Sequence, residues 1–163
     1  MCGIFGIITN EKSNLNPSDL KSIVNKLFKL SESRGKEAAG VAFLYKDSIE
    51  VFKVPVMASE LIDSKSYNNL FIKRFNGNKN FDDTVAVMGH SRLVTNGTED
   101  IHNNNQPVLK NGMACIHNGI IVNDRELWEK FPDLKREYDI DTEIILALIA
   151  KFAKKKIILC LSR

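Results

Sequence analysis

The sequence has no long hydrophobic segment and no basic leader. These two absences argue against a membrane protein and a secreted protein. No stretch of the 163-residue chain approaches the roughly 20 apolar residues that a transmembrane helix needs. The first residues, MCGIFGIITNEKSN, lack the basic start and the cleavage region of a secretory signal. We therefore expect a cytoplasmic protein without a membrane partner.

The sequence also has little net charge, few cysteines and few histidines. The 23 basic and 20 acidic residues leave a formal charge of only +3, and the lysine run at 154–156 is typical of a solvated helix end. This balance does not favour a nucleic-acid partner. Cys2, Cys115 and Cys160 are too few and too far apart for a disulfide framework or a metal site, so we expect free thiols, no metal and no cofactor.

The size and composition fit one folded domain. A chain of this length buries about two thirds of the surface that its unfolded form exposes. The 44% hydrophobic and 26% charged residues are ordinary for a globular protein. We therefore take residues 1–163 as a single domain.

Local patterns predict the elements of that domain. Runs of apolar and β-branched residues predict strands at 3–9, 39–45, 48–55, 84–91 and 113–117, the last continuing through 120–122. Helices are expected from Asn16 to about Gly35, from a cap at Asp124 to about Lys130, and from a cap at Asp141 onward. The polar segment 61–82 is expected to be a surface excursion with one short helix. Clustered strands with helices before and after them predict an α+β layered domain.

Cys2 has the most distinctive position. Removal of Met1 would make it the N-terminal residue, which holds a thiol nucleophile and, in its own α-amine, a base with a reference pKa of about 7.7–8.0. Such a residue needs no catalytic histidine. Position alone favours the alternative, a cysteine at the start of a buried strand, so the other parts of an amide-cleaving site must decide.

Four blocks of sequence resemble, in the correct order, the class II glutamine amidotransferase domain of the N-terminal nucleophile hydrolases. They are MCGIFGI at the start, SRGKEAAG at 33–40, GHSRLVTNG at 89–97, and HNGIIVN at 117–123 followed by DTE at 141–143. The resemblance is closest to the glucosamine 6-phosphate synthase type. It implies a four-layer αββα sandwich.

The resemblance implies a catalytic role for three residues. Cys2 attacks the side-chain amide of L-glutamine, so that ammonia leaves and a thioester forms, which water hydrolyses to glutamate. Asn118 and Gly119 match the oxyanion hole, where a side-chain N–H and a backbone N–H face the developing negative charge. An Asn-Gly pair is also a common turn, which is the alternative interpretation of these two residues.

The resemblance also assigns the substrate contacts. Arg92 matches the arginine that binds the α-carboxylate with paired hydrogen bonds, and Asp141 matches the carboxylate that binds the α-ammonium group. A surface ion pair and a simple helix cap are the respective alternatives. Arg34 is expected to order the nucleophile, and Thr95 and Gly97 are expected to line the pocket.

The sequence departs from the family pattern in several places. Leu93 stands where relatives that make amino sugars have an aromatic residue, Asn96 stands where they often have histidine, and Lys36 and Glu37 replace the usual residues after the Arg-Gly turn. After the DTE block only 157–161 could add a strand. We therefore expect a sandwich that is incomplete at the C-terminus, in a fragment, a truncated product or an unusually small version.

No acceptor domain is recognisable in the sequence. The expected function is therefore glutamine hydrolysis, with ammonia passed to a separate synthase subunit for amino-sugar synthesis. Two alternatives stay open. One is an N-terminal-cysteine hydrolase of another amide, and the other is a truncated, non-catalytic binding or regulatory module.

Overall fold

The computed structural model describes residues 2–75, 80–93 and 104–153 and the backbone of 159–161. Its strands are β1 (Gly3–Thr9), β2 (Ala38–Tyr45), β3 (Ser48–Val54), β4 (Val85–Arg92), β5 (Val108–Lys110), β6 (Met113–His117) and β7 (Leu159–Leu161). Its helices are α1 (Pro17–Ser31), α2 (Ala58–Asp63), α3 (Lys65–Phe75), α4 (Asp124–Lys130) and α5 (Thr142–Phe152), and a 3-10 turn, η1 (Glu32–Arg34), follows α1. The predicted α+β class is confirmed.

The strands form two sheets. The first has the order β1-β4-β2-β3 with antiparallel neighbours, and the second has the order β5-β6-β7, in which β6 and β7 are parallel. Gly3 pairs with Ser91 and Ala38 pairs with Arg92. The start of β1, the end of β4 and the start of β2 therefore meet at one end of the first sheet.

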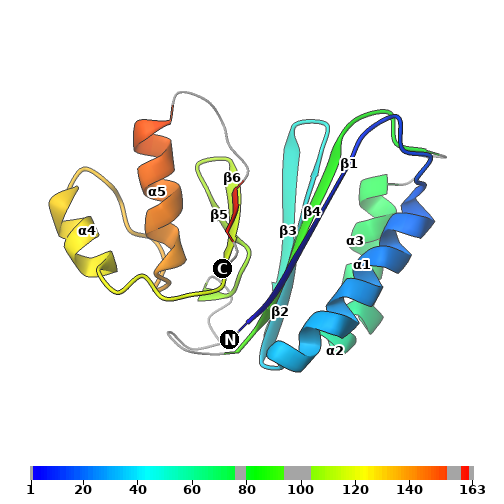
Figure 1. Ribbon diagram of the computed structural model, residues 1–163, viewed down its shortest axis with the longest axis horizontal. Coiled ribbons are helices and arrows are strands. Elements are labelled where there is room, and N and C mark those ends of the chain that lie inside the picture. Colours follow the sequence, from blue (N-terminus) through cyan, green and yellow to red (C-terminus); the bar gives the residue numbers. More distant parts are fainter. Residues whose placement is uncertain (1, 76–79, 94–103, 154–158, 162–163) are drawn as a thin grey trace.

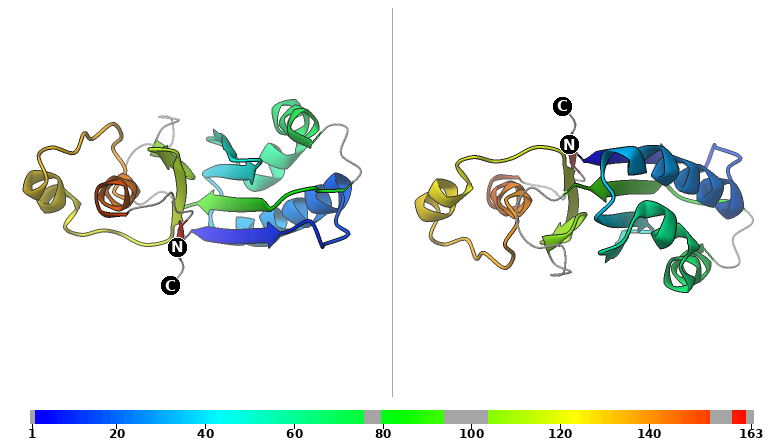
Figure 2. Two further views of the ribbon diagram at one scale, coloured as in Figure 1. Left: turned by 90° about the horizontal axis from the view of Figure 1, so that it is seen from above. Right: turned by 90° about the horizontal axis from the view of Figure 1, so that it is seen from below.

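Helices cover the outer faces of the two sheets. Helices α1, α2 and α3 lie on one face of the first sheet, the second sheet lies opposite its other face, and α5 lies on the far side of the second sheet (Figure 1, Figure 2). Between the sheets, Ala42 and Met88 pack against Ala114 and Ile116. This contact brings the strand ends of the two sheets near one another.

The segment 61–82 is not the surface excursion that we predicted. It contains the end of α2 and all of α3, which is the one helix that we predicted there, but Tyr67, Phe71 and Phe75 of α3 are buried in the core. The rings of Phe43 on β2 and Phe71 have centroids 5.1 Å apart. These three aromatic residues recur every fourth position on one helix face, a spacing that the surrounding polar residues obscured.

Two boundary predictions also need correction. Strand β6 ends at His117, and residues 120–122 do not continue it: Ile120 and Val122 are 57% and 91% exposed. Helix α4 has Asn123 rather than Asp124 at its N-cap position. The Asn16 cap of α1 is confirmed, because its side chain accepts the Asp19 amide at 2.9 Å. Within the described ranges, no helix combines the length and the apolar character needed to cross a membrane.

Candidate active site

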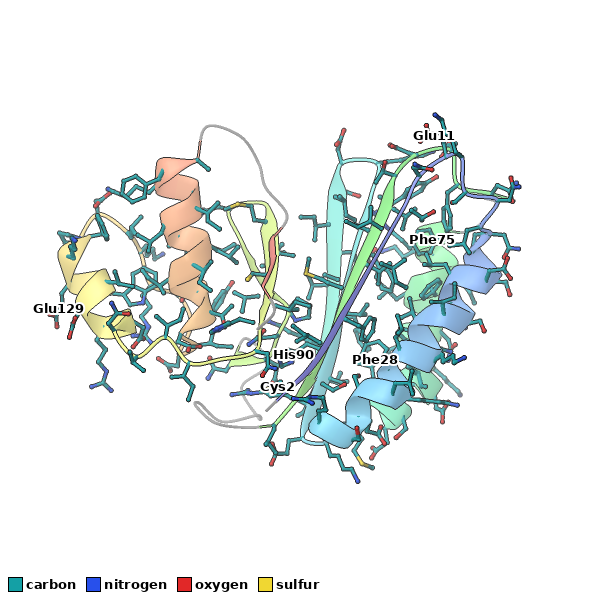
Figure 3. The ribbon with its side chains drawn as sticks, viewed as in Figure 1. Cys2, Glu11, Phe28, Phe75, His90 and Glu129 are labelled. Atoms are coloured by element: carbon teal, nitrogen blue, oxygen red, sulfur yellow. The ribbon has the colours of Figure 1, made fainter. Side chains whose placement is uncertain are left out.

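Cys2 lies where the two sheets approach each other. Its backbone nitrogen donates to the Asn118 Oδ1 atom at 3.0 Å, and its thiol is not in a disulfide. The Sγ atom lies 3.4 Å from the Leu93 amide nitrogen, which donates to it, and 3.5 Å from the Leu93 carbonyl oxygen. The sulfur can therefore donate as a thiol and accept as a thiolate at one backbone position. Figure 3 shows Cys2 at the same end of the sheets as His90.

Asn118 directly follows β6, and Gly119 comes next on an exposed stretch of backbone. The Asn118 carboxamide directs its oxygen to the Cys2 nitrogen. Because the amino group is bonded to the same carbon, its N–H donors also lie close to Cys2. The end of β6 therefore places the Asn118 carboxamide next to Cys2. A carboxamide N–H can supply one of the donors of an oxyanion hole.

Arg34 contacts the backbone of Cys2 rather than its thiol. Its Nε atom donates to the Cys2 carbonyl oxygen at 3.3 Å. The next residue, Gly35, lies directly on the end of β4: a Cβ atom there would be 2.4 Å from the Arg92 carbonyl carbon and 2.5 Å from the Ser91 oxygen. Only glycine allows this approach, which explains why Gly35 follows Arg34.

Arg92 is buried at the end of β4, with 5% of its surface exposed. Its Nη1 atom donates to the Asn104 carbonyl oxygen at 2.8 Å and to Asn105 Oδ1 at 2.6 Å. Its guanidinium therefore holds the segment 104–107, a contact that the sequence did not predict. A surface ion pair, the alternative interpretation of Arg92, is inconsistent with this burial.

Lys53 on β3 is a second buried cation that the sequence analysis missed. Its Nζ atom donates to the carbonyl oxygens of Asn105 at 2.7 Å and Pro107 at 3.2 Å. Burial and the nearby positive charge of Arg92 lower the pKa of Lys53 to about 8. Two cations from the first sheet therefore hold the segment 104–107.

Asp141 is not the side-chain cap that we predicted. It stands at the N-cap position of α5, but its side chain makes no capping hydrogen bond. Its backbone is already helical, with φ −61° and ψ −30°, whereas a capping residue is normally extended. The Oδ2 atom instead accepts the Ile121 amide at 2.7 Å, which fixes the backbone just after Gly119.

Glu143, the last residue of the DTE block, is part of a buried ion pair and binds two backbone amides. Its side chain is fully buried and lies 2.7 Å from Lys110 Nζ. It also accepts the amides of Glu137 at 2.9 Å and Tyr138 at 2.8 Å. An acidic residue among the apolar positions of α5 was the available sequence indication of this buried pair.

The structure thus brings three of the predicted residues into direct contact: Arg34 and Asn118 both bond to the Cys2 backbone. Arg92 immediately precedes Leu93, whose amide donates to the Cys2 thiol. Asp141 accepts the amide of Ile121, two residues after Gly119. The predicted pocket residues Thr95 and Gly97, with Asn96 between them, lie outside the described residues.

Comparison with known proteins gives a consistent assignment. A family model described as a glutamine amidotransferase domain matches residues 90–163. The glutamine–fructose-6-phosphate aminotransferase (isomerizing) of Sulfolobus acidocaldarius is 32% identical over 158 residues, which are 95% of this chain and 24% of that protein. The enzymes of the same name from Sulfurisphaera tokodaii and Staphylococcus epidermidis are 28% and 27% identical over 95% of this chain and cover 24% and 23% of those proteins. The chain therefore spans about a quarter of the length of these curated relatives.

Proposed function

The chain belongs to the glutamine amidotransferase domain family, and on this premise we propose that it hydrolyses the side-chain amide of L-glutamine with Cys2 as the nucleophile. One observation carries the proposal. The Cys2 nitrogen bonds to Asn118 at 3.0 Å, so the nucleophilic residue and the first oxyanion donor are in direct contact.

The reaction begins once Met1 has been removed. The Cys2 amine takes the thiol proton, and Sγ attacks the amide carbon of glutamine. The tetrahedral oxyanion accepts hydrogen bonds from Asn118 Nδ2 and the Gly119 amide. When the C–N bond breaks, the ammonium group of Cys2 returns its proton to the leaving nitrogen, and ammonia departs. Water then attacks the thioester, which gives glutamate and restores the thiol.

Arg92 and Asp141 provide the charges that an amino-acid substrate needs. In this proposal the guanidinium of Arg92 binds the α-carboxylate from its anchored position, and Asp141 binds the α-ammonium group. Thr95 and Gly97 line the pocket, and Arg34 holds the Cys2 backbone in place. The burial of Arg92 and the hydrogen bond that Asp141 accepts from the Ile121 amide, two residues after Gly119, support this arrangement.

We assign residues 1–163 to a single amidotransferase domain of the four-layer αββα type in the N-terminal nucleophile hydrolase class, in a cytoplasmic protein. The named relatives use glutamine and fructose 6-phosphate. We therefore assign the released ammonia to an acceptor synthase that makes an amino sugar.

Glutamate release by the purified protein tests the proposal, after mass spectrometry has shown that Met1 is absent. The wild type should release glutamate steadily, and Cys2→Ala should not, although it folds. A glutamine-like electrophile should label Cys2. The matched control is Cys115→Ala, which should retain both labelling and activity.

Three results would count against the proposal. Labelling confined to Cys115 or Cys160 would show that the nucleophile is misassigned. Equal hydrolysis of an amide that lacks the α-amino and α-carboxylate groups would favour another amidase. A wild type that processes Met1 but releases no glutamate would favour a non-catalytic module.

A further inference from the structure

Gln106 connects two parts of the candidate site that are far apart in sequence. Its Oε1 atom accepts the His117 amide at 2.5 Å. Its Nε2 atom donates to the His117 carbonyl oxygen at 3.0 Å and to Thr142 Oγ1 at 3.2 Å. The side chain is only 7% exposed, and all three contacts are to groups next to predicted site residues.

The first two contacts fix the end of β6. The carboxamide offers one acceptor and one donor to the backbone of His117, as a neighbouring strand would. The next residue is Asn118, so the direction of its side chain depends on the His117 peptide groups. Thr142 directly follows Asp141, so the third contact fixes the beginning of α5.

Gln106 is itself fixed from the first sheet. Lys53 holds the carbonyl groups on either side of it, at Asn105 and Pro107. A Cβ atom on Gly40 would lie 2.1 Å from the Gln106 carbonyl oxygen, so the segment rests directly on β2 at a position that only glycine permits. Cys2 directly precedes β1 of the same sheet. Gln106 therefore transmits the position of the nucleophile's sheet to the second sheet, which carries Asn118.

We propose that Gln106 is a positioning residue for amide hydrolysis: its carboxamide sets Asn118 and Asp141 in register with Cys2. The inference rests on the proposed function, since it assigns to Gln106 the placement of that reaction's oxyanion donor. Misplacement of a catalytic group by about 1 Å can slow a reaction on the order of 100-fold.

Gln106→Leu keeps the approximate size of the side chain and removes all three hydrogen bonds. We expect kcat for glutamine hydrolysis to fall about 10- to 100-fold. The rate at which iodoacetamide alkylates Cys2 should change less than about threefold, because Gln106 does not contact the thiol. The matched control is Val108→Ala, which removes buried volume two positions away in β5 and no hydrogen bond. At an equal loss of melting temperature, it should retain kcat.

Gln106→Glu distinguishes positioning from a general packing role through the pH dependence of its kcat. A protonated carboxyl group, like the carboxamide, has both a donor and an acceptor, whereas the ionised form repels the His117 carbonyl oxygen. Burial raises the pKa of such a carboxyl group. The kcat of the variant relative to wild type should therefore rise as the pH is lowered from 8 to 6, while the relative kcat of Val108→Ala stays constant.

Wild-type kcat and KM in Gln106→Leu, a loss no larger than in the stability-matched control, or a flat relative pH profile for Gln106→Glu would each overturn the inference. Hydrogen exchange separates its failure from that of the proposed function. The His117 amide should exchange faster in Gln106→Leu than in wild type, whether or not the protein releases glutamate. An inactive wild type would refute the function alone, and unchanged His117 exchange would refute the Gln106 link alone.

Discussion

The backbone nitrogen of Cys2 donates to the carboxamide oxygen of Asn118 at 3.0 Å, across 116 positions of sequence. This bond joins the beginning of one sheet to the end of a strand in the other. It also bears on the chemistry. If Met1 is removed, the same nitrogen becomes an amine whose N–H points at Asn118, which leaves its lone pair available for the thiol proton.

Asn118→Ala tests the oxyanion assignment. The variant loses a donor to the tetrahedral intermediate, so we expect kcat for glutamine hydrolysis to fall by about 10²–10³-fold with a smaller change in KM. Asn118→Asp keeps an acceptor for the Cys2 nitrogen but has no donor for an oxyanion, and should be at least as impaired. Steady-state glutamate release measures both variants.

The control for this prediction is Asn123→Ala. Asn123 is the same residue type five positions further along, and its side chain makes no capping bond to α4. It should retain full activity. Normal activity in Asn118→Asp would show that the contact with Cys2 is structural and that the oxyanion donor lies elsewhere.

A form of the protein whose N-terminus carries an uncleavable extension tests the role of the α-amine. Its Cys2 nitrogen is an amide that cannot accept a proton, so glutamate release should be lost to the detection limit. Iodoacetamide should still alkylate the folded protein at Cys2. The same extension at the C-terminus is the control. Comparable activity in both forms would require a different base.

The sequence predicted the elements next to the site best. Strand β1 occurs at the predicted position, 3–9, and β6 occupies the predicted 113–117 without the continuation to 120–122, because each is a short apolar run that ends at polar or turn-forming residues. The buried face of α3 was missed because three aromatic residues on that face stand among asparagine, lysine and serine. There the tertiary contact with β2, rather than local composition, determines the structure.

Site residues could be predicted only where they belong to a recognisable family motif. Cys2, Asn118 and Arg34 stand in recognisable blocks, and the structure brings them together. Lys53 and Gln106 stand in no such block, and their contacts arise only when β3, β6 and the segment 104–107 meet. Local sequence contains no information about such long-range neighbours. The predicted capping role of Asp141 is wrong for a local reason, because the backbone of this residue is already helical.

Removal of Glu143 should destabilise the fold strongly. Glu143→Ala leaves the Lys110 ammonium buried without its closest partner and leaves two loop amides without their acceptor. Breaking a buried pair in this way costs about 3–5 kcal/mol in the free energy of unfolding. Urea unfolding measures the loss. Lys151→Met is the control, because the Lys151–Asp133 pair is solvent-exposed and should contribute less than about 1 kcal/mol.

His90 makes the free energy of unfolding depend on pH. It is 1% exposed on β4, and neither ring nitrogen has a hydrogen-bond partner within the described residues. Burial, together with the charges of Arg92 and His117, lowers the pKa of His90 from 6.5 to about 3. Between these two pH values the unfolded chain binds a proton that the folded chain does not, so stability present above pH 6.5 is lost as the pH falls toward 3.

His90→Leu removes this titration while keeping a side chain of similar size. Each pH unit in the window corresponds to about 1.4 kcal/mol, so the wild type should lose on the order of 2 kcal/mol more than His90→Leu between pH 7 and pH 5. Urea unfolding at the two pH values measures the difference. Met88→Leu, on the same face of β4, should follow the wild type. If His90→Leu also follows it, the imidazole is protonated in the folded protein, and the space between the sheets must be open to water.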